Sequence, residues 1–174
     1  MNLISILIFS FVIISILGTV LHFTHGWFKK GILLHIFSAI NESTWEHMKL
    51  LVFPTLLVMV FQFVSIKDLY NNLWNSLLVL FLVQVLTIPL LFEPLRFLIK
   101  KVPLLINILI FYFSIFLGLL FEYYFLSKEI FIFNEYLCIF FIVLLLILFF
   151  IFTYYPPKFF LFKDPVTKRY GDIK

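Results

Sequence analysis

Apolar and polar residues are distributed along this chain in long blocks rather than in short amphipathic periods. Five apolar blocks are each long enough to cross a bilayer, which takes about 20 residues of α-helix. They lie at residues 2–22, 45–66, 73–95, 103–124 and 135–155, and short polar segments separate them. The pattern predicts an all-α integral membrane protein, a bundle of about five transmembrane helices occupying residues 1–155.

Two further segments complete the predicted organisation. Residues 31–40 are apolar but too few to cross a bilayer as a helix, which predicts a short interfacial or re-entrant segment between the first two spans. Residues 156–174 begin with Pro156 and Pro157, which end the fifth span. We expect these last residues to form a cytoplasmic tail that packs on the bundle.

The composition agrees with a lipid-embedded protein. Hydrophobic residues make up 64% of the chain and charged residues 13%, too few to cover a soluble domain. We expect the lipid bilayer as partner and no nucleic acid, because the basic residues flank apolar blocks. Cys138 is the single cysteine, which excludes an intrachain disulfide. The first block is expected to stay in the protein, since residues 1–5 carry no Lys or Arg and no cleavage pattern follows.

The basic residues also predict an orientation. Of the 13 Lys and Arg residues, eleven fall on the side that contains the loop after the first span, the loop after the third span and the tail. Only Lys67 and Lys128 fall on the other side. Positive residues accumulate in cytoplasmic loops, so we expect the N-terminus outside and the C-terminus in the cytoplasm.

Polar residues gather at the predicted cytoplasmic end. All four histidines lie between positions 22 and 47, and Glu93 and Asn107 reach the same level. Imidazoles and carboxylates are ligands for a divalent metal ion, the only cofactor that the pattern favours, and the candidate ligands are His22, Glu42, Glu46 and His47. Glu42, Glu46 and His47 are also the catalytic candidates. The other candidates in this cluster are His25, His35, Asn41, Ser43, Trp45, Lys49, Glu93 and Asp164.

A structural interpretation of the same residues stands beside the chemical one. Ser43 and Glu46 have the spacing of a capping box, in which Ser43 accepts from the Glu46 amide and Glu46 accepts from the Ser43 amide. On a helix that begins here, Glu42, Glu46 and Lys49 share one face, and Ser43 and His47 share a neighbouring one. Glu93 either pairs locally with Arg96 or joins the cluster from the third span. In the fourth span, Ser114 and Gly118 have the spacing of a close helix contact.

Two segments resemble an uncharacterised family of small bacterial membrane proteins. The first runs from Gly18 through His22 to residues 41–50, the N-E-S-x-W-E-H-x-K-L motif. The second is the closing motif, in which Pro156 and Pro157 precede residues 161–167 and a Tyr-Gly pair. Where that family carries a glycine before the tyrosine, this chain has Lys168 and Arg169. The resemblance implies a multi-spanning protein of the bacterial cytoplasmic membrane whose tail lies against the motif, and it implies no activity.

Three functions remain open at this stage. The first is a metal-dependent membrane enzyme that uses the histidines and carboxylates of the cluster. The second is a non-catalytic membrane partner or assembly protein in which the motif is a structural clasp. The third is a small transporter or proton carrier that relays charge through Glu93 and the histidines. The sequence names no substrate, metal or oligomeric state.

Overall fold

The computed structural model describes residues 2–27, 32–99 and 102–171, without the side chains of residues 25, 26 and 32–34. In this part the chain forms α1 (Leu3–Trp27), α2 (Ile32–Phe37), α3 (Thr44–Ile66), α4 (Leu73–Leu98), α5 (Leu104–Ser127), α6 (Glu135–Tyr154) and the 3-10 turn η1 (Phe160–Phe162). Five of these helices are long and apolar enough to cross a membrane. The predicted fold class is therefore confirmed.

The helices begin close to the expected positions and three of them end later. α1 continues to Trp27, α4 to Leu98 and α5 to Ser127, because neither a proline nor a glycine follows directly at the end of the apolar block. The short segment between the first two spans contains α2, a helix of six residues. Several residues that the predictions from sequence used lie outside the described residues, namely Lys29, Lys30, Gly31, Lys100, Lys101 and Lys174.

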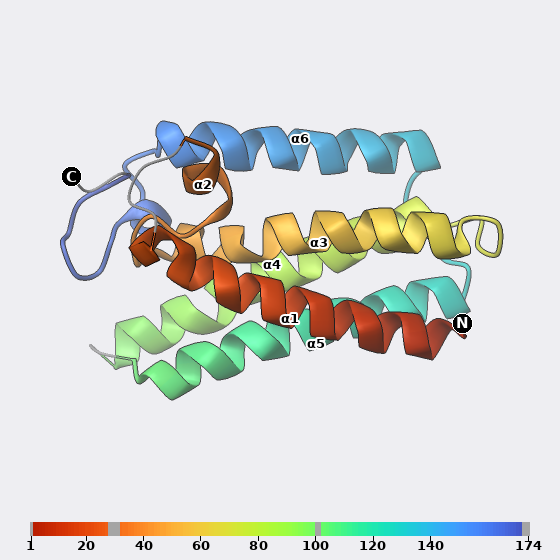
Figure 1. Ribbon diagram of the computed structural model, residues 1–174, viewed down its shortest axis with the longest axis horizontal. Helices are drawn as coiled ribbons and strands as arrows, with labels where there is room; N and C mark the ends of the chain where they lie inside the picture. The colour runs from red at the N-terminus through yellow and green to blue at the C-terminus, as the bar shows by residue number, and fades with distance from the viewer. Residues whose placement is uncertain (1, 28–31, 100–101, 172–174) are drawn as a thin grey trace.

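The helices α3 and α4 form the centre of the bundle. Figure 1 shows α6 along one side of this pair, and α1 and α5 along the other. The most hydrophobic stretches of α3 and α4 are 56% and 61% buried within the protein, whereas that of α6 is 22% buried. Much of the apolar surface of α6 therefore faces outward, as expected of a helix that contacts lipid.

Close packing between α4 and α5 depends on Gly118. A Cβ atom at this position would lie 3.0 Å from the carbonyl oxygen of Leu80 and 3.1 Å from the Cβ atom of Gln84. The backbones can approach this closely only without a side chain, as at small-residue contacts between membrane helices. Ser114, one turn earlier, is fully buried. The predicted close contact of the fourth span is present at Gly118.

The two ends of the bundle differ in what they carry. We call the end where α1 and α4 finish and α3 begins the motif end, because it contains residues 41–50 (Figure 1). At the opposite end, Glu135 of α6 accepts hydrogen bonds from the backbone amides of Trp74 at 2.7 Å and Asn75 at 3.3 Å. The first amides of α4 thus obtain partners from another helix.

Candidate functional site

The start of α3 is fixed by two capping side chains. Ser43 is the N-cap residue, and its Oγ accepts from the backbone amide of Glu46 at 3.4 Å. The amide of Ser43 donates to Asn41 Oδ1 at 2.8 Å. Glu46 does not bind the Ser43 amide, so only half of the predicted capping box forms. Asn41 takes the other half because its side chain lies two residues before the amide, as in an Asx turn.

Glu46 is instead part of a buried ion pair with Lys49. The Lys49 Nζ atom lies 2.6 Å from Glu46 Oε2, and both side chains are almost fully buried. Glu46 Oε2 also accepts from the amide of Ile40 at 3.0 Å, and Lys49 donates to the carbonyl oxygen of His35 at 2.8 Å. The pair therefore binds α3 to α2 and to the loop that follows α2.

Glu42 does not join this face of α3. The helix begins at Thr44, so Glu42 precedes the cap and its side chain is 56% exposed. The predicted alignment of Glu42 with Glu46 and Lys49 is wrong for this reason, since the helical spacing of three and four residues applies only inside a helix.

Glu93 connects α4 to the beginning of α3. Its Oε1 atom accepts a hydrogen bond from the Thr44 hydroxyl and lies 3.4 Å from Arg96 NH1. Both proposed roles of Glu93 are therefore present, because the carboxylate pairs locally with Arg96 and also reaches the motif. The two interactions together fix the end of α4 against the cap of α3.

Within its described residues, the tail contacts the motif through a hydrogen bond and an aromatic cluster. Asn41 Nδ2 donates to the carbonyl oxygen of Gly171 at 2.9 Å. The indole of Trp45 stacks on Phe149 of α6 with ring centroids 4.3 Å apart, and lies 4.6 Å from the ring of Phe162 in η1. Trp45 thus packs between the fifth span and the tail.

A tight turn presents the tail to the motif. Asp164 Oδ1 accepts from the amides of Val166 at 2.6 Å and Thr167 at 3.2 Å, and the Asp164 carbonyl accepts from Lys168 N at 3.0 Å. Lys168 has φ of 62°, the left-handed conformation that glycine adopts most readily. Of the two residues that stand where the resemblance implies a glycine, Lys168 and Arg169, the first therefore keeps a glycine-like backbone. We refer to Asn41, Ser43, Thr44, Trp45, Glu46, Lys49, Glu93 and the Gly171 carbonyl together as the clasp.

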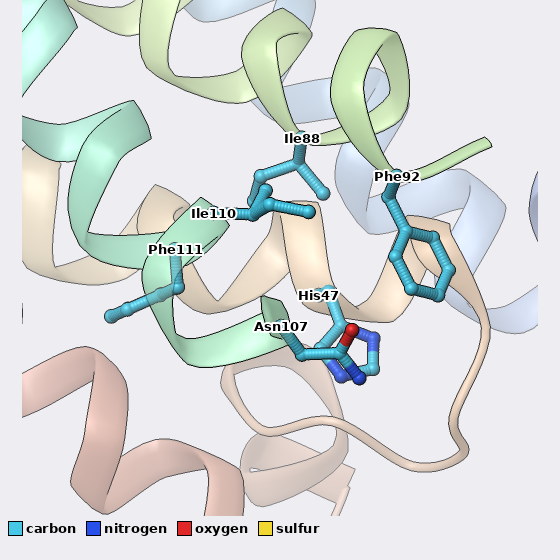
Figure 2. Close-up of a pocket in the computed structure, with 6 residues that line it drawn as sticks. All are labelled: His47, Ile88, Phe92, Asn107, Ile110 and Phe111. Atoms are coloured by element: carbon cyan, nitrogen blue, oxygen red, sulfur yellow. The ribbon is translucent and has the colours of Figure 1, made fainter. Parts of the chain in front are cut away.

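The two described histidine side chains of α1 and α3, His22 and His47, form a pair beside the clasp. The rings of His22 and His47 are 5.6 Å apart between centroids, and His47 Nε2 lies 3.7 Å from Glu42 Oε2. His47 Nδ1 contacts the carbonyl oxygen of Ser43 at 3.0 Å, as their common helix face predicts. Figure 2 shows His47 beside Asn107 in a small pocket whose other walls, Ile88, Phe92, Ile110 and Phe111, are apolar.

The four candidate metal ligands do not come together. Glu46 pairs with Lys49, on a different side of α3 from His47. Within residues 2–27, 32–99 and 102–171, no group of three His, Cys, Asp or Glu side chains has an arrangement that can hold a metal ion. The side chain of His25 lies outside the described residues.

Comparison with known proteins assigns the chain to a family. Residues 2–172 match the Family of unknown function (DUF6512). The chain belongs to this family. Neither the curated proteins nor the solved structures contain a match. The DUF6512 match extends over every clasp residue, from Asn41 to Gly171, so one family pattern includes both the motif and the tail.

Two members of the clasp were not among the sequence candidates. Thr44 carries the hydrogen bond to Glu93, and Gly171 provides the carbonyl that Asn41 binds. Thr44 lies inside the motif, but its partner is 49 residues away and no spacing rule relates the two. Gly171 has φ of 71°. Its place after Tyr170 in the closing motif is the sequence feature that could have identified it as a candidate.

Proposed function

We propose that this member of the DUF6512 family is a non-catalytic membrane partner or assembly protein, in which the motif is a structural clasp. The clasp closes the cytoplasmic mouth of a bacterial membrane protein and presents the tail to a second protein. This orientation is supported by the distribution of Lys and Arg, eleven on the motif end and tail side against two on the other.

One observation carries the proposal: the polar side chains of Asn41, Glu46 and Glu93 in the clasp are each engaged by two bonds within the protein. Glu46 is held by Lys49 and the Ile40 amide, Glu93 by Thr44 and Arg96, and Asn41 by Ser43 and Gly171. A general base must keep a lone pair within hydrogen-bond reach of its substrate. Glu46, which lies almost fully buried beside a lysine, does not fit that role.

The direct test removes the tail and follows two properties of the same sample. A chain ending at Tyr155 is compared with the full-length protein by circular dichroism in detergent and by native electrophoresis of solubilised membranes. We expect the shortened chain to stay helical and to lose any complex that the full-length protein forms. Val166→Ala, a change at a tail position that is 74% exposed, is the matched control and is expected to retain the complex. Truncation that leaves both folding and complex formation intact contradicts the proposal.

The histidine pair favours one second candidate, a proton carrier. Glu42, His47 and His22 form a short series of titratable groups from the exposed surface toward α1. Glu42 Oε2 lies 3.7 Å from His47 Nε2, and the ring centroids of His47 and His22 are 5.6 Å apart. His22 Nδ1 and Asn107 Oδ1 are buried and have no hydrogen-bond partner among the described residues. Carboxylate and histidine chains of this kind mark proton relays in membrane proteins.

Proton flux into proteoliposomes distinguishes the two candidates. Under the clasp proposal the wild type and His47→Ala show equal flux after a pH jump. A flux in the wild type that falls by an order of magnitude in His47→Ala, but not in the control Lys158→Gln at an exposed lysine of the tail, supports the proton carrier instead.

A further inference from the structure

A second polar cluster lies inside the bundle, toward the end opposite the motif. It consists of Ser10 on α1, Gln62 on α3 and Glu122 on α5, and each of these residues is 0% exposed. Gln62 Nε2 donates to Ser10 Oγ at 3.0 Å and to Glu122 Oε2 at 3.3 Å. One amide therefore joins three of the five long helices.

The hydrogen bonds of the cluster leave oxygen atoms unused. The Ser10 hydroxyl donates to the carbonyl oxygen of Ile6 at 2.8 Å, so its proton is directed away from Glu122. Glu122 Oε1 and Gln62 Oε1 are both buried, and neither has a hydrogen-bond partner among the described residues. Three helices thus contribute hard oxygen atoms to one buried location, with a single amide as the donor.

Glu122 also has no basic partner. The ion pairs of the described residues join Glu42 to His47, Glu46 to Lys49 and Glu93 to Arg96, all at the motif end. At the opposite end, the charged residues nearest the helix ends are exposed, namely Lys67, Asp68, Lys128 and Glu129. Glu135 is engaged by the first amides of α4. No charged side chain of α1, α3 or α4 within the described ranges pairs with Glu122.

An isolated carboxylate in such surroundings is strongly disfavoured. Moving an ionised carboxylate out of water costs several kcal/mol even after relaxation, and ionisable groups inside membrane proteins are generally paired or functional. Gln62 supplies one hydrogen bond from a neutral amide, which does not offset that cost. The cluster therefore requires one positive charge that no described side chain provides.

We propose that Ser10, Gln62 and Glu122 form a binding site for one monovalent cation, either a proton or an alkali-metal ion. Either cation acts in the same way, because it carries a single positive charge that neutralises the Glu122 carboxylate. Oxygen ligands are those that hard cations prefer. The site is separate from the clasp and does not depend on it, since it lies at the other end of the helices and shares no residue with it.

Infrared spectroscopy of proteoliposomes tests the proposal. The carbonyl band of a protonated carboxylic acid is followed from acid to alkaline buffer, in choline chloride and in sodium chloride. We expect a band that Glu122→Gln removes and that Glu129→Gln, a change at an exposed carboxylate of the same end, leaves unchanged. A band that disappears on raising the pH in choline chloride identifies a proton as the occupant. A band that sodium chloride abolishes at constant pH identifies an alkali-metal ion.

Two outcomes overturn the proposal. One is a Glu122 band that is constant across the pH range in both salts, because such a carboxyl group is a fixed neutral residue. The other is the absence of any Glu122 band in both salts throughout the range. If Glu122→Gln does not fold, Glu122→Asp keeps a carboxyl group and must shift the band and its pH dependence. Thermal unfolding gives an independent readout, since the midpoint must depend on pH or on sodium more strongly in the wild type than in Glu122→Gln.

Discussion

Asn41 donates a hydrogen bond from its side-chain nitrogen to the carbonyl oxygen of Gly171 at 2.9 Å, although the two residues are 130 positions apart. The same side chain accepts from the Ser43 amide through its oxygen. Asn41 therefore links the cap of α3 to the last described residue of the tail. An amide side chain can do both because it carries a donor and an acceptor.

Asn41→Asp separates these two bonds. The carboxylate keeps the acceptor for Ser43 and loses the donor to Gly171, so we expect the free energy of unfolding to fall by about 1–3 kcal/mol. Chemical unfolding in detergent, followed by circular dichroism, measures the loss. In a chain that ends at Tyr155 the same substitution should cost much less, because the tail contact is already gone. If Asn41→Asp lowers the free energy of unfolding equally in the full-length and the shortened chain, the bond to Gly171 contributes nothing to stability.

Lys49→Met should be among the most destabilising changes at the motif end. It leaves the Glu46 carboxylate buried at 3% exposure without its cation, which typically costs about 3–5 kcal/mol. The double variant Glu46→Gln/Lys49→Met removes both charges and keeps an acceptor for the Ile40 amide. We therefore expect the double variant to be more stable than Lys49→Met alone in the same unfolding assay. If the double variant is less stable than Lys49→Met, the unpaired charge of Glu46 is not the reason why Lys49→Met loses stability.

The left-handed backbone at Lys168 predicts an order of stability among substitutions. This conformation costs a non-glycine residue about 1–2 kcal/mol of folding free energy, a cost that glycine does not have. Glycine gives up about 0.5–1 kcal/mol of this gain, because it loses more conformational entropy on folding. Lys168→Gly should therefore stabilise the protein slightly, and Lys168→Val should destabilise it because a β-branched side chain fits this region poorly. Thermal unfolding of the three proteins gives the order. Val166 lies two residues earlier and has no positive φ, so Val166→Gly should lower the unfolding midpoint, whereas Lys168→Gly should raise it.

Removal of divalent metal should not affect the motif end. Under the clasp proposal, treatment with a chelator leaves the thermal unfolding midpoint unchanged in the wild type, because protein groups hold the motif residues together. Elemental analysis of the purified wild type, His22→Ala and His47→Ala should give the same metal content. A stoichiometric metal ion that both histidine variants lose would favour the membrane enzyme over the clasp.

The sequence by itself determined the elements of this protein, because the relevant physics is local. A run of apolar residues long enough to span lipid must form a helix, whatever its neighbours are, since its backbone groups have no other partners there. The five long helices and the short segment containing α2 were predicted on this basis, and the cap at Ser43 was one of the two interpretations that the motif allowed. The close approach of Gly118 to α4 was also expected from a local pattern.

Only the tertiary structure decided which side chains meet. Glu46 had two acceptable partners by spacing, the Ser43 amide and Lys49, and the position of α2 against α3 favours Lys49 by supplying the His35 carbonyl and the Ile40 amide. The contacts of Thr44 with Glu93 and of Gln62 with Glu122 depend on how each helix is rotated about its axis. Hydrophobic length does not encode that rotation, because a helix that is apolar on all sides has no face that the pattern distinguishes.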